Sequence, residues 1–102
     1  EVDLAAFGIG VQAFVSVQLK RHTRAAVARF EETAIRLPQV VALYHLTGRN
    51  DYLAHAVAQD MDHLRDFTLD AITSLPEVAR VETSLLFRAT KKAVWPDLAE
   101  EA

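Results

Sequence analysis

The chain has 102 residues, of which 51% are hydrophobic and 25% charged, and its formal net charge is −3. This size allows one hydrophobic core, and the composition excludes a mainly disordered chain. The acidic balance argues against direct binding to nucleic-acid phosphates, and the absence of cysteine excludes disulfides and thiolate metal sites.

Residues 11–19 predict the first β-strand, because every second residue is apolar and those between are mostly polar; the apolar set is Val11, Ala13, Val15, Val17 and Leu19. Thr23 is a plausible N-cap for a following helix, which Pro38 ends. The apolar stripe of that helix is Val27, Phe30, Ala34 and Leu37. Residues 40–47 are rich in β-forming side chains and predict the second strand.

The run Gly48-Arg49-Asn50-Asp51 has the composition of a turn and predicts a hairpin to a third strand at 52–58. Asp60 or Asp62 can cap a second helix that ends at Pro76, with an apolar stripe of Leu64, Phe67, Ala71, Ile72 and Leu75. Residues 78–87 predict the fourth strand, with one side formed by Val81, Thr83, Leu85 and Phe87.

The two halves of the chain resemble each other. The segments 37–40 and 75–78, Leu-Pro-Gln-Val and Leu-Pro-Glu-Val, each end a helix and open a strand. A repeated strand-helix-strand unit predicts an α+β, ferredoxin-like βαββαβ fold, with a four-stranded antiparallel sheet and two helices on one face. We expect this domain at residues 11–88, with a C-terminal tail at 89–102 in which only Val94-Trp95-Pro96 packs on anything.

Two helices cover only one face of such a sheet. If they cover Val15 and Val17, the other face mixes polar side chains with apolar ones: Gln12, Phe14, Gln18, Tyr44 with Leu46 or Leu43 with His45, Val57, Arg80, Glu82 and Leu86. An apolar patch of this kind is typical of an interface, so we expect a homodimer that forms through the sheet.

The chain resembles the Lrp/AsnC family of transcriptional regulators. Residues 46–53, Leu-Thr-Gly-Arg-Asn-Asp-Tyr-Leu, are similar to the family's Gly-x-x-Asp-Tyr hairpin. Residues 75–78, the Val-Glu-Thr run at 81–83 and the opening at 8–17 also resemble the family, and the likeness covers about residues 5–92. It implies the effector-binding and oligomerisation domain of a regulator, in which dimers gather into higher oligomers such as octamers.

In this family the effector, typically an amino acid, binds where dimers meet, and a helix-turn-helix domain that binds DNA precedes this domain. No such domain is found in the chain, which does not begin with Met. We therefore expect residues 1–10 to be a linker from a missing DNA-binding domain, and DNA to be bound only through that domain.

The resemblance also implies effector-binding residues: Thr47, Gly48, Arg49, Asn50, Asp51, Tyr52 and Thr83. Gly48 would let the backbone approach a ligand, and Asp51 would bind its ammonium group. The amides near Arg49 and Asn50 would receive a carboxylate, and Tyr52 would form a wall. Val81 stands where amino-acid-binding relatives have the first of two threonines, which puts the effector's identity in doubt.

Other chemistries have little support in the sequence. The four histidines, His22, His45, His55 and His63, lack the spacing of a metal site, and we expect no metal, cofactor or catalytic group. A stand-alone or ACT-like amino-acid-binding module, or a small dimeric ferredoxin-like enzyme, remains an alternative. No membrane-spanning run or secretory signal is present, so we expect a cytoplasmic protein.

Overall fold

The computed structural model describes residues 3–99. A short 3₁₀-helix at Leu4–Phe7 leads into strand β1 at Val11–Leu19. Helix α1 (Arg24–Ala34), strands β2 (Val40–His45) and β3 (Tyr52–Ala58), helix α2 (Met61–Phe67) and strand β4 (Val78–Leu85) follow. A π-helical segment, Thr68–Ile72, continues α2. The order of elements is the predicted βαββαβ.

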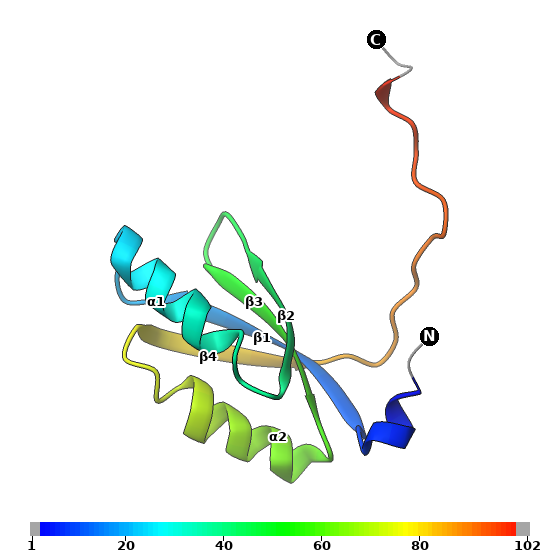
Figure 1. The fold of residues 1–102 in the computed structure, drawn as a ribbon, viewed down its shortest axis with the longest axis horizontal. Coiled ribbons are helices and arrows are strands. Elements are labelled where there is room, and N and C mark those ends of the chain that lie inside the picture. Colours follow the sequence, from blue (N-terminus) through cyan, green and yellow to red (C-terminus); the bar gives the residue numbers. More distant parts are fainter. Residues whose placement is uncertain (1–2, 100–102) are drawn as a thin grey trace.

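The four strands form one antiparallel sheet in the order β2-β3-β1-β4, and α1 and α2 cover the same face of it (Figure 1). The first strand is therefore central and bonded along both edges. The alternation that predicted it is confirmed, since Ala13, Val15, Val17 and Leu19 are all buried. In β3 the buried positions are Tyr52 followed by three alanines, Ala54, Ala56 and Ala58.

The helices fit the sheet through the predicted stripes. The side chain of Thr23 accepts a hydrogen bond from the Ala26 amide at 3.1 Å, and Asp60 accepts one from the His63 amide at 2.8 Å, so both expected caps form. Of the two aspartates that could cap α2, Asp60 is the one used. The core between helices and sheet includes Phe30, Phe67 and Ile72, with Val27, Leu37, Ala71 and Leu75 packed at its border.

The strand ends differ from the prediction. β2 ends at His45 rather than at residue 47, and β4 ends at Leu85 rather than at residue 87. Two register shifts also occur, one in β2 between Val40 and Ala42, and one where β1 passes β4 between Gln18 and Leu19. A bulge adds a residue that alternation alone does not reveal, so neither shift could be predicted from a period-2 pattern.

The face of the sheet opposite the helices is open. Its members are Gln12, Phe14, Ser16, Gln18, Ala42, Tyr44, Leu53, His55, Val57, Arg80, Glu82 and Ser84, as the cross-strand pairs show. Leu43 packs on the core instead, which settles the choice between the Tyr44 and Leu43 sets in favour of Tyr44. The rings of Phe14 and His55 pack near the middle of this open face, with centroids 5.1 Å apart and planes tilted by 32°.

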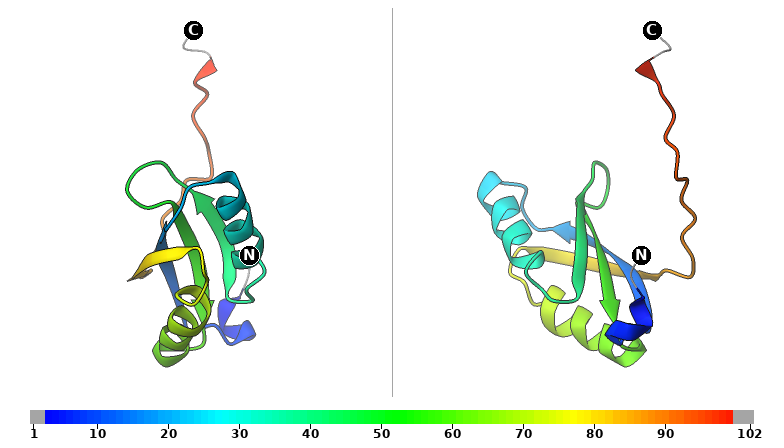
Figure 2. Two further views of the ribbon diagram at one scale, coloured as in Figure 1. Left: turned by 90° about the vertical axis from the view of Figure 1, so that its left-hand side faces the viewer. Right: turned by 45° about the vertical axis from the view of Figure 1, so that its right-hand side comes forward.

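Beyond Leu85 the chain leaves the sheet and runs away from the body of the protein as an extended segment (Figures 1 and 2). Val94 and Trp95, which we expected to pack, are 79% and 86% exposed. That expectation is wrong for the single chain, because the segment lies too far from its own sheet and helices to contact them.

Candidate functional site

The hairpin between β2 and β3 carries most of the expected site residues. It is closed by a hydrogen bond from the Leu46 amide to the Asp51 carbonyl at 2.9 Å. Gly48 at its tip has φ +112°, which other residues rarely adopt. No atom lies within 4 Å of the place where a Cβ would stand. Within this chain the glycine is therefore required by the backbone angle and not by a close contact.

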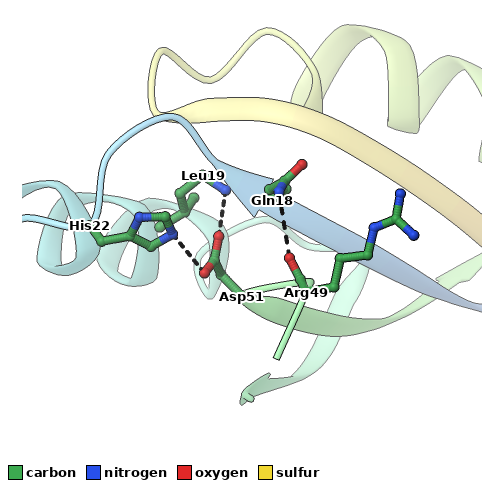
Figure 3. Close-up of polar contacts among 5 residues, drawn as sticks. All are labelled: Gln18, Leu19, His22, Arg49 and Asp51. Carbon is green, nitrogen blue, oxygen red and sulfur yellow. Dashed lines mark hydrogen bonds and ion pairs between the residues drawn. The ribbon is translucent and has the colours of Figure 1, made fainter. Parts of the chain in front are cut away.

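Asp51 connects this hairpin to two other segments. Its carboxylate accepts a hydrogen bond from the Leu19 amide at 2.7 Å, and its other oxygen lies 2.8 Å from Nε2 of His22 (Figure 3). The Asp51 amide also donates to the Val17 carbonyl at 3.0 Å. The Asp51 side chain is only 13% exposed. This residue therefore holds the hairpin against the end of β1 and against the loop before α1.

A polar hollow of about 100 Å³ lies beside the hairpin, lined by Ser16, Arg49, Asn50, Arg80, Val81 and Glu82. The ladder between β1 and β4 explains this grouping, because Ser16 is paired with Glu82 and Gln18 with Arg80. Gln18 also donates to the Arg49 carbonyl at 3.5 Å, and the Arg49 side chain points away from Asp51 (Figure 3). The hollow thus has two guanidinium groups and one carboxylate around it.

The structure brings together only part of the predicted site. Arg49 and Asn50 line the hollow, whereas Thr47, Gly48 and Asp51 belong to the same hairpin but not to its lining. Thr83 is paired with Val15 on the helix-covered face, so it also lies outside the lining. Arg80 and Glu82 were assigned from the sequence to the open face but not to the site. Alternation along β4 was the signal for their direction, but only the sheet order places them beside the hairpin.

Tyr52 points into the protein and not into the hollow. Its side chain is 1% exposed, its ring stacks on His45 at 4.4 Å, and its hydroxyl donates to the Glu31 carboxylate. Burial, together with this bond and the nearby negative charge, raises the pKa of the Tyr52 phenol above its usual range. Tyr52 therefore joins the hairpin to α1 as a neutral hydrogen-bond donor.

Two other kinds of site are absent from residues 3–99. This part of the chain has no group of three or more His, Asp or Glu side chains placed to hold a metal ion. Nor does it have a helix of the length and apolar character needed to cross a bilayer.

Residues 12–96 match the family model described as the Lrp/AsnC ligand binding domain. Over 93 residues the chain is 34% identical to the HTH-type transcriptional regulator AldR of Mycolicibacterium smegmatis, covering 91% of this chain and 54% of that protein. It is also 34% identical to the transcriptional regulator AzlB of Bacillus subtilis, covering 91% and 59%. The chain thus spans between half and three fifths of the length of these curated relatives.

Solved structures agree with the sequence matches. A transcriptional regulator of Neisseria meningitidis in complex with L-Met superposes with a TM-score of 0.82 at 26% identity, covering all of this chain and 66% of that one. The AldR of Mycobacterium tuberculosis gives a TM-score of 0.77 at 26% identity, covering 94% and 65%.

Proposed function

The chain belongs to the Lrp/AsnC family of transcriptional regulators, and we propose that it senses an α-amino acid and couples its binding to the assembly of the regulator. In this proposal the domain is not an enzyme. DNA is bound by a helix-turn-helix domain outside these residues, and the protein works in the cytoplasm, where bacterial and archaeal DNA lies.

The observation that carries the proposal is the charge pattern around the hollow beside the hairpin. An α-amino acid at neutral pH has a carboxylate and an ammonium group close together. Arg49 and Arg80 offer charge-assisted donors for the carboxylate, and Glu82 offers an acceptor for the ammonium group. The neighbouring hairpin residues Thr47, Gly48, Asn50 and Asp51 complete the proposed effector-binding set. Tyr52 and Thr83, the other two residues that the family resemblance implies, point away from the hollow in this chain. The L-Met bound to the Neisseria meningitidis relative supports a ligand of this class.

Asp51 remains in the proposed effector-binding set although its carboxylate already accepts hydrogen bonds within the chain. A carboxylate has about four acceptor positions, and the Leu19 amide and His22 use two of them. The remaining positions can accept from an ammonium group. Ligand binding at Asp51 would then affect both β1 and the loop before α1.

The size of the hollow supports a site shared between subunits. Its volume of about 100 Å³ is well below the roughly 300 Å³ at which enclosed ligand pockets begin. One protomer therefore supplies part of a site, and we propose that a neighbouring dimer completes it in an octamer or a similar oligomer. An effector that binds only the completed site has a higher affinity for the assembled form than for separate dimers. This difference in affinity shifts the equilibrium towards the assembly, as a switch requires.

Titration calorimetry with each of the twenty amino acids tests the proposal, with sedimentation recorded before and after addition. We expect at least one amino acid to bind and to shift the oligomer distribution. Arg80→Gln should weaken that binding about tenfold or more, which corresponds to about 1.4 kcal/mol. Arg36→Gln is the matched control, because Arg36 is exposed and pairs only with Glu32 on the surface of α1.

Two results would contradict the proposal. One is a lack of binding by all twenty amino acids to the assembled protein. The other is an Arg80→Gln variant that binds as tightly as the parent and the Arg36→Gln control.

A further inference from the structure

The hollow beside the hairpin has more positive than negative charge in its lining. It has two guanidinium groups, those of Arg49 and Arg80, and one carboxylate, that of Glu82. None of the ion pairs within residues 3–99 involves any of these three side chains. All three residues are exposed in the single chain, so each keeps its charge. The lining therefore has an excess of one positive charge that no ion pair in the described part of the chain neutralises.

Asp51 does not remove this excess, although it belongs to the same hairpin. It lies outside the lining, and its two oxygens are occupied by the Leu19 amide at 2.7 Å and by the His22 ring at 2.8 Å. The Arg49 side chain extends away from Asp51, on the side of Gln18 (Figure 3). Asp51 can therefore assist an ammonium group without neutralising either of the two arginines.

The two arginines reach the hollow from different elements. Gln18 of β1 lies between them, because it is paired with Arg80 of β4 and its side chain donates to the Arg49 carbonyl at 3.5 Å. Arg80 and Glu82 are instead two residues apart on one strand, so their side chains leave the same face about 7 Å apart. The carboxylate and the ammonium group of an α-amino acid are attached to one carbon, and this neighbouring pair suits them. Arg49 then remains as a third charged contact.

The cover that the proposed function requires makes this third contact decisive. A neighbouring dimer that completes the site withdraws its lining from water, and burying an unpaired charge is costly. A neutral amino acid would pair with Arg80 and Glu82 and leave the Arg49 guanidinium without a partner. An amino acid with a second carboxylate pairs with all three side chains.

We propose that the effector is an acidic α-amino acid, aspartate or glutamate, whose side-chain carboxylate binds Arg49 while its α-carboxylate and ammonium group bind Arg80 and Glu82. This assignment rests on the proposed function, because it concerns the same site, and it goes further by naming the class of ligand. Arg49 is then the residue that determines specificity, since it distinguishes a carboxylate from an amide of the same shape.

Two pairs of matched ligands test the class of effector. L-Glutamate and L-glutamine, and likewise L-aspartate and L-asparagine, differ only in a carboxylate that is replaced by an amide. In calorimetry on the assembled protein, the acidic member of at least one pair should bind about tenfold or more tightly than its amide, because hydrogen bonds to charged groups are the stronger ones. Glutarate, which lacks the ammonium group, should bind more weakly than L-glutamate, because Glu82 then has no partner.

Variants of the two arginines test their separate roles. Arg49→Gln should weaken binding of the acidic ligand about tenfold and leave binding of its amide nearly unchanged, so that the preference is lost. Arg49→Lys keeps the charge and should retain most of the preference. Arg80→Gln should weaken both members of the pair, because both have the α-carboxylate. Arg36→Gln, on the surface of α1, is the control and should alter neither.

Other outcomes overturn the assignment in distinguishable ways. Tighter binding of a neutral amino acid than of both aspartate and glutamate excludes the acidic class and leaves the proposed function intact. A preference for the acidic ligand that persists in Arg49→Gln contradicts the role of Arg49. Equal binding of glutarate and L-glutamate contradicts the role of Glu82. A lack of binding by all twenty amino acids excludes this assignment and the amino-acid site of the proposed function together.

Discussion

The carboxylate of Asp51 is bonded through both oxygens, to the amide of Leu19 and to the ring of His22. The first of these bonds is partly buried and closes the end of the central strand, whereas the His22 side chain is 64% exposed. A hydrogen bond to a partly buried charged acceptor contributes more than an exposed ion pair does. The Leu19 bond is therefore the stronger of the two.

This difference gives a prediction at a single residue. Asp51→Ala should lower the free energy of unfolding by about 1.5–3 kcal/mol, because the Leu19 amide loses its acceptor. Asp51→Asn should cost less, since the amide oxygen can still accept from Leu19. Urea unfolding of the two variants measures both values, and an equal cost for Ala and Asn would show that the charge and not the acceptor matters.

The sequence predicted the residues of the hairpin but not the whole lining of the hollow. Gly48 and Asp51 have strong local signals, because turn geometry restricts which residues can occupy those positions. Arg80 and Glu82 are about thirty residues away along the chain, and they meet the hairpin only because β1 lies between β3 and β4. Thr83 lies on the face opposite Glu82, as the alternation along β4 indicates.

At the level of helices and strands, most of the correct predictions came from residues that are close together in the sequence. Both caps and the β1 alternation are read from short stretches of sequence. The two proline stops are less accurate, because the helical segments end at Ala34 and Ile72, four residues before Pro38 and Pro76. The π-helical turn at Thr68–Ile72 was not predicted, although the apolar residues at positions 67, 71, 72 and 75 tolerate it. The bulges at Gln18/Leu19 and Val40/Ala42 were also missed, because they arise from pairing between strands.

The helix caps give a prediction at this level. Thr23→Ala and Asp60→Ala should each lower the free energy of unfolding by about 0.5–2 kcal/mol, because each cap satisfies an amide of the first helical turn. Asp62→Ala is the matched control within α2: its side chain is 85% exposed and does not cap the helix. Thermal unfolding followed by circular dichroism compares the three variants. A cost for Asp62→Ala equal to that of Asp60→Ala would contradict the assignment of the cap.

For the whole molecule, the open face makes stability depend on pH through His55. Burial, and then the charge of Lys91, lowers the pKa of His55 below its usual value of 6.5. The unfolded chain therefore binds a proton more readily than the folded one between these two pKa values. The contribution of His55 to stability is present above the unfolded value and is lost as the pH falls through the folded one.

We therefore expect the free energy of unfolding to fall as the pH is lowered below about 6.5, the ordinary pKa of histidine. Part of this fall should disappear in His55→Gln, which keeps an amide donor near the Gln12 oxygen that lies 2.9 Å from His55. Urea unfolding at several pH values provides the measurement. The assignment to His55 is contradicted when the variant and the parent have the same pH slope.

The central position of β1 also determines how movement can pass through the protein. One end of this strand is fastened to the hairpin by Asp51, and at the other end Gly10 lies so close to β3 that an added Cβ would stand 2.2 Å from the Gln59 carbonyl oxygen. Sliding by one residue would turn every side chain of the strand to the wrong face. Because β1 resists sliding, we expect a displacement of the hairpin to move this strand as one unit. The displacement would then reach the opposite end of the sheet, where the N-terminal segment and the segment after β4 leave it.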